Sequence, residues 1–144
     1  GVEVSSSGYE SVWLTEDAND GVYHSDYNGW LTLDEDAWFE IDFGQTYVIE
    51  SIMLSPAQNG GDGEDFCIGR MTVQASTDGS SYDTVGEFEH PQYGTSGTQL
   101  DDWEIDFSTP VEAQQLRFTD LEEARASYIG IGELEAWGAP PECY

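Results

Sequence analysis

The sequence predicts an all-β domain, a sandwich or jelly roll built from six or more short strands. Segments in which apolar and polar residues alternate recur along the whole chain, as expected for half-buried strands. Turn signals built on Gly, Pro and Asp separate these segments at short intervals, which is typical of β-sandwiches. The only helix candidate is one or two turns near residues 121–124.

The expected strands follow one another in chain order. The first ends at Gly44, and the third runs into a turn built on the Asp78-Gly79 pair. Two long loops, residues 57–66 and 90–102, interrupt the pattern. Loops of this length in a compact domain are often functional, and simple flexibility is the alternative. The strand segments are residues 38–43, 47–54, 71–76, 82–88, 103–107, 115–119 and 129–137.

Acidic residues dominate the charge of the chain. Its 144 residues, about one domain's length, contain 30 Asp and Glu against 3 Lys and Arg, for a formal charge of -27. Such a surface repels phosphates, so we expect no binding to nucleic acid or to an anionic membrane. The hydrophobic content of 38% and the aromatic content of 13% indicate a folded core and not a disordered tail. The three cations are Arg70, Arg117 and Arg125.

The charge also favours an extracellular setting, because high ionic strength screens the self-repulsion of so acidic a chain. No run of 18 apolar residues that would span a bilayer is present. We expect residues 1–144 to form a single domain, with residues 139–144 leading into a linker of a larger protein. Cys67 and Cys143 are compatible with one disulfide or with two free thiols.

Four segments, in order, carry a resemblance to a known family. They are Ala18-Asn19-Asp20-Gly21 with Ser25 and Tyr27, Trp38 to Gly44 with Tyr47 to Ile49, Ile68-Gly69-Arg70 with Ser76 to Gly79, and Leu116-Arg117-Phe118 with Ile131 to Gly138. From about residue 15 to residue 138 the chain resembles the discoidin, or coagulation factor C-type, domain. Within that family it is similar to the galactose-oxidase-type carbohydrate-binding modules. The resemblance implies a jelly-roll β-sandwich of about eight strands, with its binding loops at one end.

A structural calcium ion is the cofactor that we expect. Ca²⁺ prefers about six to eight oxygen ligands from carboxylates and carbonyls. Asp20 and Glu133 would supply carboxylates. Gly21 would allow the segment of residues 17–25 to curl so that several of its carbonyls face the ion. The alternative is an Asp-Gly turn beside an exposed glutamate. Further oxygens would come from Ser25 and Gly132 and, as the resemblance implies, from the carbonyls of Asp17 and Val22.

Sugar recognition needs an aromatic surface for the apolar face of the ring and polar groups for its hydroxyls. For each aromatic candidate, the alternative to a ligand contact is packing at the core or its rim. For Arg70 the alternative is a structural ion pair. Strand patterns place three other tryptophans in the expected core: Trp38, Trp103 and Trp137. The candidates on the presumed binding loops are Asn28, Trp30, Asn59, Asp65, Phe66, Arg70, Tyr93 and Tyr128.

Catalysis is not expected. His24 and His90 are the only histidines, and the chain contains no nucleophile elbow, zinc-protease motif or phosphate-binding loop. We therefore expect a non-catalytic, calcium-stabilised, extracellular carbohydrate-binding module of a larger enzyme or adhesin. Its ligand would be a poly- or oligosaccharide or cell-surface glycan, neutral and galactose-like by resemblance, because the negative field opposes anionic glycans. A cell-adhesion or protein-binding domain of the same fold is the alternative.

Overall fold

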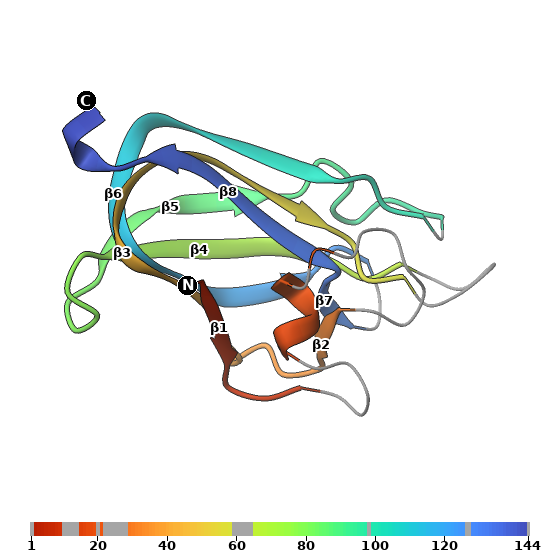
Figure 1. The fold of residues 1–144 in the computed structure, drawn as a ribbon. Helices are drawn as coiled ribbons and strands as arrows, with labels where there is room; N and C mark the ends of the chain where they lie inside the picture. Colours follow the sequence, from red (N-terminus) through yellow and green to blue (C-terminus); the bar gives the residue numbers. More distant parts are fainter. Residues whose placement is uncertain are drawn as a thin grey trace.

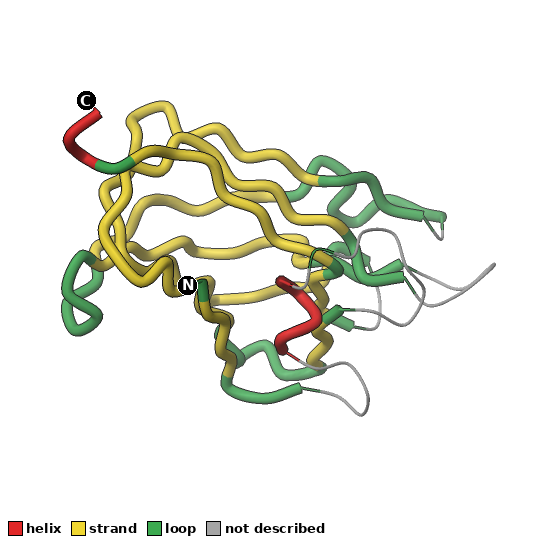
Figure 2. The backbone as a smooth tube through the Cα atoms, in the orientation of Figure 1, coloured by secondary structure: helices red, strands yellow, loops and turns green. Residues whose placement is uncertain are grey.

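A computed structural model describes residues 2–9, 15–19, 21, 29–58, 65–97, 99–125 and 128–143. Strands dominate it, joined by turns and loops (Figure 1; Figure 2). The all-β prediction is confirmed, and the described residues form eight strands. In chain order the elements are β1 (Glu3–Ser6), η1 (Thr15–Asn19), β2 (Trp30–Thr32), β3 (Phe39–Ser55), β4 (Ile68–Ser76), β5 (Asp83–Glu89), β6 (Trp103–Glu123), β7 (Ile129–Ile131), β8 (Glu133–Ala139) and η2 (Pro141–Cys143).

Two long strands, β3 and β6, contribute to both layers of the sandwich. The first half of β3 pairs with β1 and with the second half of β6. The second half of β3 lies between β8 and the first half of β6. β4 and β5 extend the first layer, in the order β1-β3-β6-β4-β5, and β2 pairs separately with β7.

A bend in each long strand separates the two layers. The register of β3 against β6 shifts between Asp42 and Tyr47, where both ribbons turn at the left of Figure 1. Gly44 lies in this bend with a φ of 81°, a left-handed conformation that favours glycine. Each long strand therefore joins two of the short strands that the sequence predicts.

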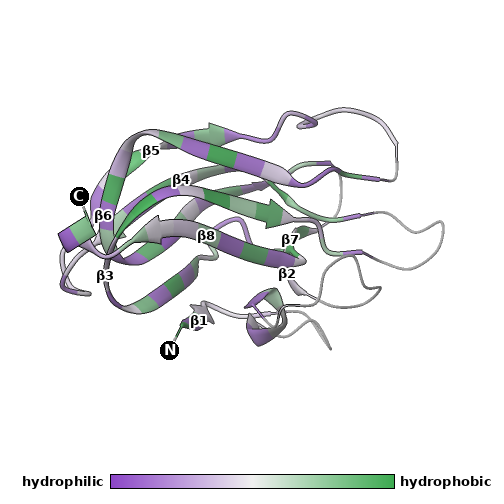
Figure 3. Ribbon diagram, turned by 45° about the horizontal axis from the view of Figure 1, so that its top comes forward, coloured by the Kyte–Doolittle hydropathy of each residue, from purple (hydrophilic) through white to green (hydrophobic). Residues whose placement is uncertain are grey.

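Aromatic and branched side chains from both layers fill the core. The ring of Phe39 lies 5.0 Å from that of Trp30 and 6.3 Å from that of Phe118, centroid to centroid. All three side chains are fully buried, and so are Ile52 and Leu54 from the opposite layer. Apolar and polar positions alternate along the ribbons of Figure 3, as in strands with one face turned to the core.

Of the three tryptophans expected in the core, only Trp103 is buried. Trp38 is half-buried, with its ring beside the guanidinium of Arg117. Trp137 is 43% exposed, so its assignment to the core is wrong. The strand period explains the difference, because Leu134 and Ala136 of β8 pack in the core, while the alternate residue Trp137 faces outward.

The helix candidate near residues 121–124 is also wrong. Leu121 to Glu123 are the end of β6, which contains a bulge at Asp120 with a φ of 51°. The bulge adds one residue between buried positions, so Phe118, Leu121 and Ala124 recur at spacing three. Apolar spacing of this kind imitates one face of a helix.

The outer face of the larger layer is polar and is held together by Arg117. Its guanidinium lies 2.7 Å from Glu40 and 4.2 Å from the centre of the Tyr82 ring. The Tyr82 hydroxyl lies 3.0 Å from Glu40, and burial, followed by this hydrogen bond, raises the pKa of Tyr82. The network uses one of the three cations of the chain to neutralise a strand carboxylate.

Both cysteines are free thiols in the structure. Cys67 is buried and Cys143 is exposed, and burial raises the pKa of the Cys67 thiol to about 12. Such a thiol is a core residue and not a reactive one. No helix in the described ranges has the length and apolar character needed to cross a membrane.

Candidate functional site

The loops that the sequence analysis singled out meet at one end of the sandwich. Leu54 pairs with Trp103 and Ser55 with Glu133, while Ile68 pairs with Glu123. The connections after β3, β5 and β6 therefore leave from the same end, on the right in Figure 1 and Figure 2. The turn between β4 and β5 and the bends of β3 and β6 lie at the other end.

Arg70, near the start of β4, is the centre of a polar cluster at this loop end. Its Nη2 lies 2.7 Å from Glu89, and its Nη1 lies 3.5 Å from Glu122. Its guanidinium carbon lies 4.2 Å from the centre of the Tyr93 ring, a cation–π contact. The hydrogen bond to Glu89 raises the pKa of Arg70. The structural ion pair that was the alternative for Arg70 is therefore present. The same guanidinium also contacts the ring of Tyr93.

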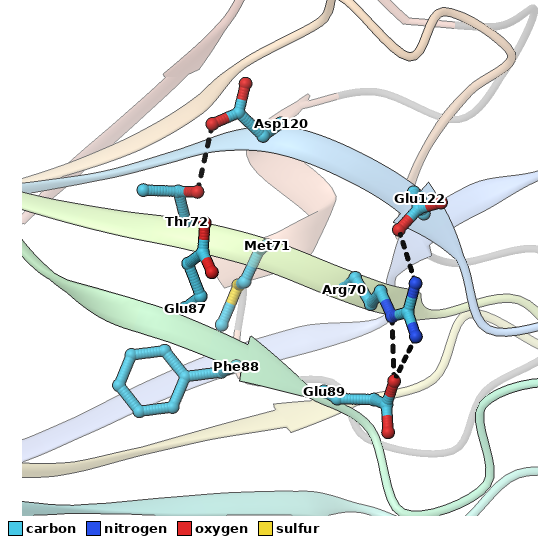
Figure 4. A pocket seen from close by; sticks show the side chains of 8 residues that line it. All are labelled: Arg70, Met71, Thr72, Glu87, Phe88, Glu89, Asp120 and Glu122. Carbon is cyan, nitrogen blue, oxygen red and sulfur yellow. Dashed lines mark hydrogen bonds and ion pairs between the residues drawn. The ribbon is translucent and has the colours of Figure 1, made fainter.

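A groove of about 410 Å³ extends from this cluster along β4 (Figure 4). Thr72 lies two residues beyond Arg70 on the same face, and its hydroxyl donates to Asp120 at 2.9 Å. Carboxylates from β5 and β6 form the two sides. The lining residues are Arg70, Met71, Thr72, Glu87, Phe88, Glu89, Asp120 and Glu122.

Most of the groove residues were not predicted as site residues. A signal exists in the spacing of polar residues two apart, at Arg70 and Thr72 in β4 and at Glu87 and Glu89 in β5. That spacing places each pair on one face of its strand. It does not say which strands are neighbours, and the order β6-β4-β5 brings the pairs together.

The loop of residues 90–102 is held in shape by His90, which is only 2% exposed. The backbone N–H of Gln92 donates to Nδ1 at 3.0 Å, so the proton of a neutral ring is on Nε2, 3.3 Å from the carbonyl oxygen of Asp101. The ring packs against Trp103 at 5.2 Å. Burial lowers the pKa of His90, against the smaller opposing effect of Asp101. The neutral ring thus closes the loop that carries Tyr93.

Acidification is expected to weaken this loop. Because the pKa of His90 is lower in the folded chain than in the unfolded one, its contribution to stability is complete above about pH 6.5 and decreases as the pH falls toward the folded pKa. The melting temperature of the wild type minus that of His90→Gln should therefore shrink between pH 7.5 and 5. Taking the difference between the two melting temperatures cancels the effect of pH on the 30 Asp and Glu residues, because both proteins contain them. A constant difference would contradict the prediction.

Tyr128 lies before β7 at the loop end and is half-buried. Its ring meets the edge of Phe66 at 5.1 Å. Phe66 is itself 5% exposed and exchanges backbone hydrogen bonds with Ala57, at 2.7 and 2.8 Å. Asp65 is buried and accepts a hydrogen bond from the backbone of Leu100 at 3.0 Å. Phe66 and Asp65 therefore support the loops, and Tyr128 is the ring of this group with an accessible surface.

Trp30 is not a ligand contact. Its side chain is fully buried, its ring packs on Phe39, and its indole N–H donates to the carbonyl of Gly8 at 2.8 Å. No face of this ring is accessible to a sugar, which corrects the expectation from its position in the sequence. The other two candidates on these loops, Asn28 and Asn59, lie outside the described residues.

Glu133, the expected calcium ligand of the last strand, is 3% exposed. Its two carboxylate oxygens accept the N–H of Gly21 at 3.3 and 3.2 Å, which joins β8 to the chain just after η1. The exposed glutamate of the alternative interpretation is therefore wrong. Gly132 beside it donates its N–H to Ser55 at 2.7 Å. The other expected ligands lie outside the described residues, at Asp20, Val22 and Ser25, as does the side chain of Asp17.

Calcium requires oxygen ligands, and among the described residues the carboxylate of Glu133 is a buried group of that kind. Within the described ranges, no three His, Cys, Asp or Glu side chains gather in a metal-binding cluster. The second carboxylate of the expected set, that of Asp20, is not among those residues. The calcium site therefore stays a prediction, with the carboxylate of Glu133 as its described part.

The chain matches one domain family and is similar in structure to several carbohydrate-binding modules. The family model of the F5/8 type C domain matches residues 2–134. The family 32 CBM of NanJ from Clostridium perfringens, in complex with galactose, has a TM-score of 0.70 at 18% identity, over 94% of this chain and 92% of that one. CBM32-3 from a family 31 glycoside hydrolase of the same organism has a TM-score of 0.76 at 21% identity, over 95% and 90% of the two chains.

A third similar structure is a much longer chain. The glycoside hydrolase CpGH89 of Clostridium perfringens, in complex with GlcNAc-alpha-1,4-galactose, has a TM-score of 0.73 at 17% identity. The match covers 99% of this chain but 14% of that one. A search of curated proteins found no match.

Proposed function

Because the chain belongs to the F5/8 type C domain family, with residues 2–134 matched, we propose that it is a non-catalytic carbohydrate-binding module. The observation that carries this proposal is the cluster at the loop end, where Arg70, Glu122 and Tyr93 combine charged groups with an aromatic ring. Sugar sites in general combine ring surfaces with a few hydrogen-bonding groups. Tyr128 adds a second half-exposed ring at the same end.

The ligand is a neutral glycan, galactose-like by analogy with the neighbours that hold galactose and GalNAc-beta-1,3-galactose. The electrostatics support this choice. All three arginines have partners: Arg70 and Arg117 bind carboxylates, and Arg125 donates to Gln99 and Thr95. With a net charge of -27, the field opposes uronates and sulfated sugars.

The module acts as an accessory domain of a larger extracellular protein. One similar structure is a whole glycoside hydrolase of which this fold is a small part. His90, the one histidine among the described residues, is held in a structural role and is not available as an acid or base. The charge favours a setting of high ionic strength outside the cell.

We also propose that calcium stabilises the fold at Glu133. The carboxylate is buried and lies against the segment that begins the expected metal loop. Calcium prefers oxygen ligands, carboxylates among them, and the carboxylate of Glu133 is one such ligand at the expected position. The ion would hold β8 to the segment after η1 and would take no part in chemistry.

Adhesion through an apolar loop tip is not favoured. The exposed large apolar side chains among the described residues are Val2, Tyr9, Leu33 and Trp137. None of them belongs to the described parts of the loops between β3 and β4, β5 and β6, or β6 and β7.

Replacing Tyr128 by alanine is expected to weaken sugar binding about tenfold or more. Loss of a stacked ring removes about 1–3 kcal/mol of binding free energy, and tenfold corresponds to about 1.4 kcal/mol. Calorimetric titration with galactose and with GalNAc-beta-1,3-galactose measures the effect. Trp137→Ala is the matched control, because it removes an exposed aromatic ring from β8. Unchanged affinity in Tyr128→Ala, or equal loss in Trp137→Ala, would contradict the assignment.

A further inference from the structure

The groove along β4 is lined by polar side chains beyond the loop-end site, which is the cluster of Arg70, Glu122 and Tyr93. The additional polar residues are Thr72, Glu87 and Asp120. Thr72 pairs with Glu87 on one side and with Thr119 on the other. Arg70 pairs with Glu89 and Glu122 in the same way, two residues nearer the loops. The groove therefore has an outer end at Arg70 and an inner end at Thr72, about 7 Å apart by the rise of a strand.

A backbone irregularity brings Asp120 to the inner end. The register of β4 against β6 is irregular between Arg70 and Thr72, so that two residues of β6, Asp120 and Leu121, lie opposite Met71. Leu121 is buried, whereas Asp120 is exposed on the groove side and accepts the Thr72 hydroxyl. In Figure 4 the side chains of Thr72, Asp120 and Glu87 gather at one end of the groove.

Donors and acceptors are both present along the groove, as sugar hydroxyls require. The Arg70 guanidinium uses Nε and Nη2 for Glu89 and Nη1 for Glu122. A guanidinium has five N–H donors, so two of them remain for a ligand. Carboxylates at the two sides accept from hydroxyls, while the side chains of Met71 and Phe88 pack toward the core beneath the groove. The volume of about 410 Å³ lies in the range of small-ligand pockets.

We propose that this groove is a second sugar subsite that continues the loop-end site onto the sheet. The inference rests on the proposed function, and it narrows the ligand to a neutral oligosaccharide of two or more residues instead of a single terminal sugar. Arg70 and Tyr93 stand at the junction of the two subsites, because Arg70 lines the groove and stacks on a residue of the 90–102 loop. Uronic acid residues are excluded from the groove by its carboxylates.

The test compares the gain in affinity with chain length between variants. Wild type is titrated calorimetrically with galactose, with GalNAc-beta-1,3-galactose and with neutral tri- and tetrasaccharides that contain galactose. We expect affinity to rise about tenfold from one sugar to two or three, as a few added hydrogen bonds provide. In the double variant Glu87→Gln/Asp120→Asn most of that gain disappears, while the affinity for galactose stays within about twofold of wild type. Asn tolerates the left-handed backbone of position 120.

The matched control is Glu104→Gln/Asp106→Asn, which makes the same change in charge at two exposed positions of β6 outside the groove. It should keep the full gain with chain length. The subsite proposal is overturned if the groove variant keeps the gain, if the control loses it equally, or if wild type binds galactose as tightly as the longer sugars. In each of these cases the proposed function stands. Absence of binding to every sugar would overturn the proposed function and the subsite with it.

Discussion

Chelation of calcium is expected to lower the melting temperature of this domain by about 10 °C, and Glu133→Gln is expected to remove most of that response. An ion that binds only the native state stabilises it by about 4 kcal/mol at a thousandfold excess over Kd. For a domain of this size each kcal/mol corresponds to a few degrees. The effect should depend on Glu133, the proposed ligand among the described residues, whose carboxylate is buried and accepts the N–H of Gly21 after η1.

The size of the Glu133→Gln effect on the melting temperature should depend on the metal. In calcium the variant melts below wild type, because a ligand is lost. In EDTA it melts at about the same temperature as wild type, because the ion whose ligand the variant lacks is then absent from both proteins. Glu135→Gln, on the same strand and less buried, is the matched control and should respond to calcium as wild type does. An unchanged wild-type melting curve in protein shown by elemental analysis to be metal-free would refute the calcium proposal.

The strands were predictable because a sandwich imposes a period of two on every segment with one buried face. The long strands were not, because bends such as that at Gly44 have the same local signature as a loop. The bulge at Asp120 changed the apolar spacing from two to three and produced a false helix signal. These differences arise where one residue departs from regular strand geometry.

The candidate site was predictable in part. Arg70 was singled out because it follows the Gly-rich loop of residues 57–66, and it proved to be the centre of the loop-end cluster. Its partners Glu89 and Glu122 depend on which strands lie beside β4, and an alternating pattern carries no information on strand order. Trp30 shows the converse, since an aromatic residue near a loop gives no sign of whether it faces the core.

Gly132→Ala is expected to destabilise the fold by about 3 kcal/mol, at the upper end of the usual cost of overpacking. A Cβ atom at this position would lie 2.1 Å from the carbonyl oxygen of Pro56 and 2.7 Å from its carbonyl carbon. These are backbone atoms, so no side-chain rotation relieves the overlap. The hydrogen bond from Gly132 to Ser55, at 2.7 Å, holds the two segments at this distance.

Thermal unfolding measures the effect of Gly132→Ala, which should lower the melting temperature by about 10 °C. Gly8→Ala is the matched control, because nothing lies within 4 Å of a Cβ at that position, and it should melt near wild type. The loss in Gly132→Ala should persist in EDTA, since the overlap does not involve the metal, and this separates it from the effect of Glu133. If Gly132→Ala melted within a degree or two of wild type, the chain entering β8 would not lie as close to the end of β3 as the structure requires.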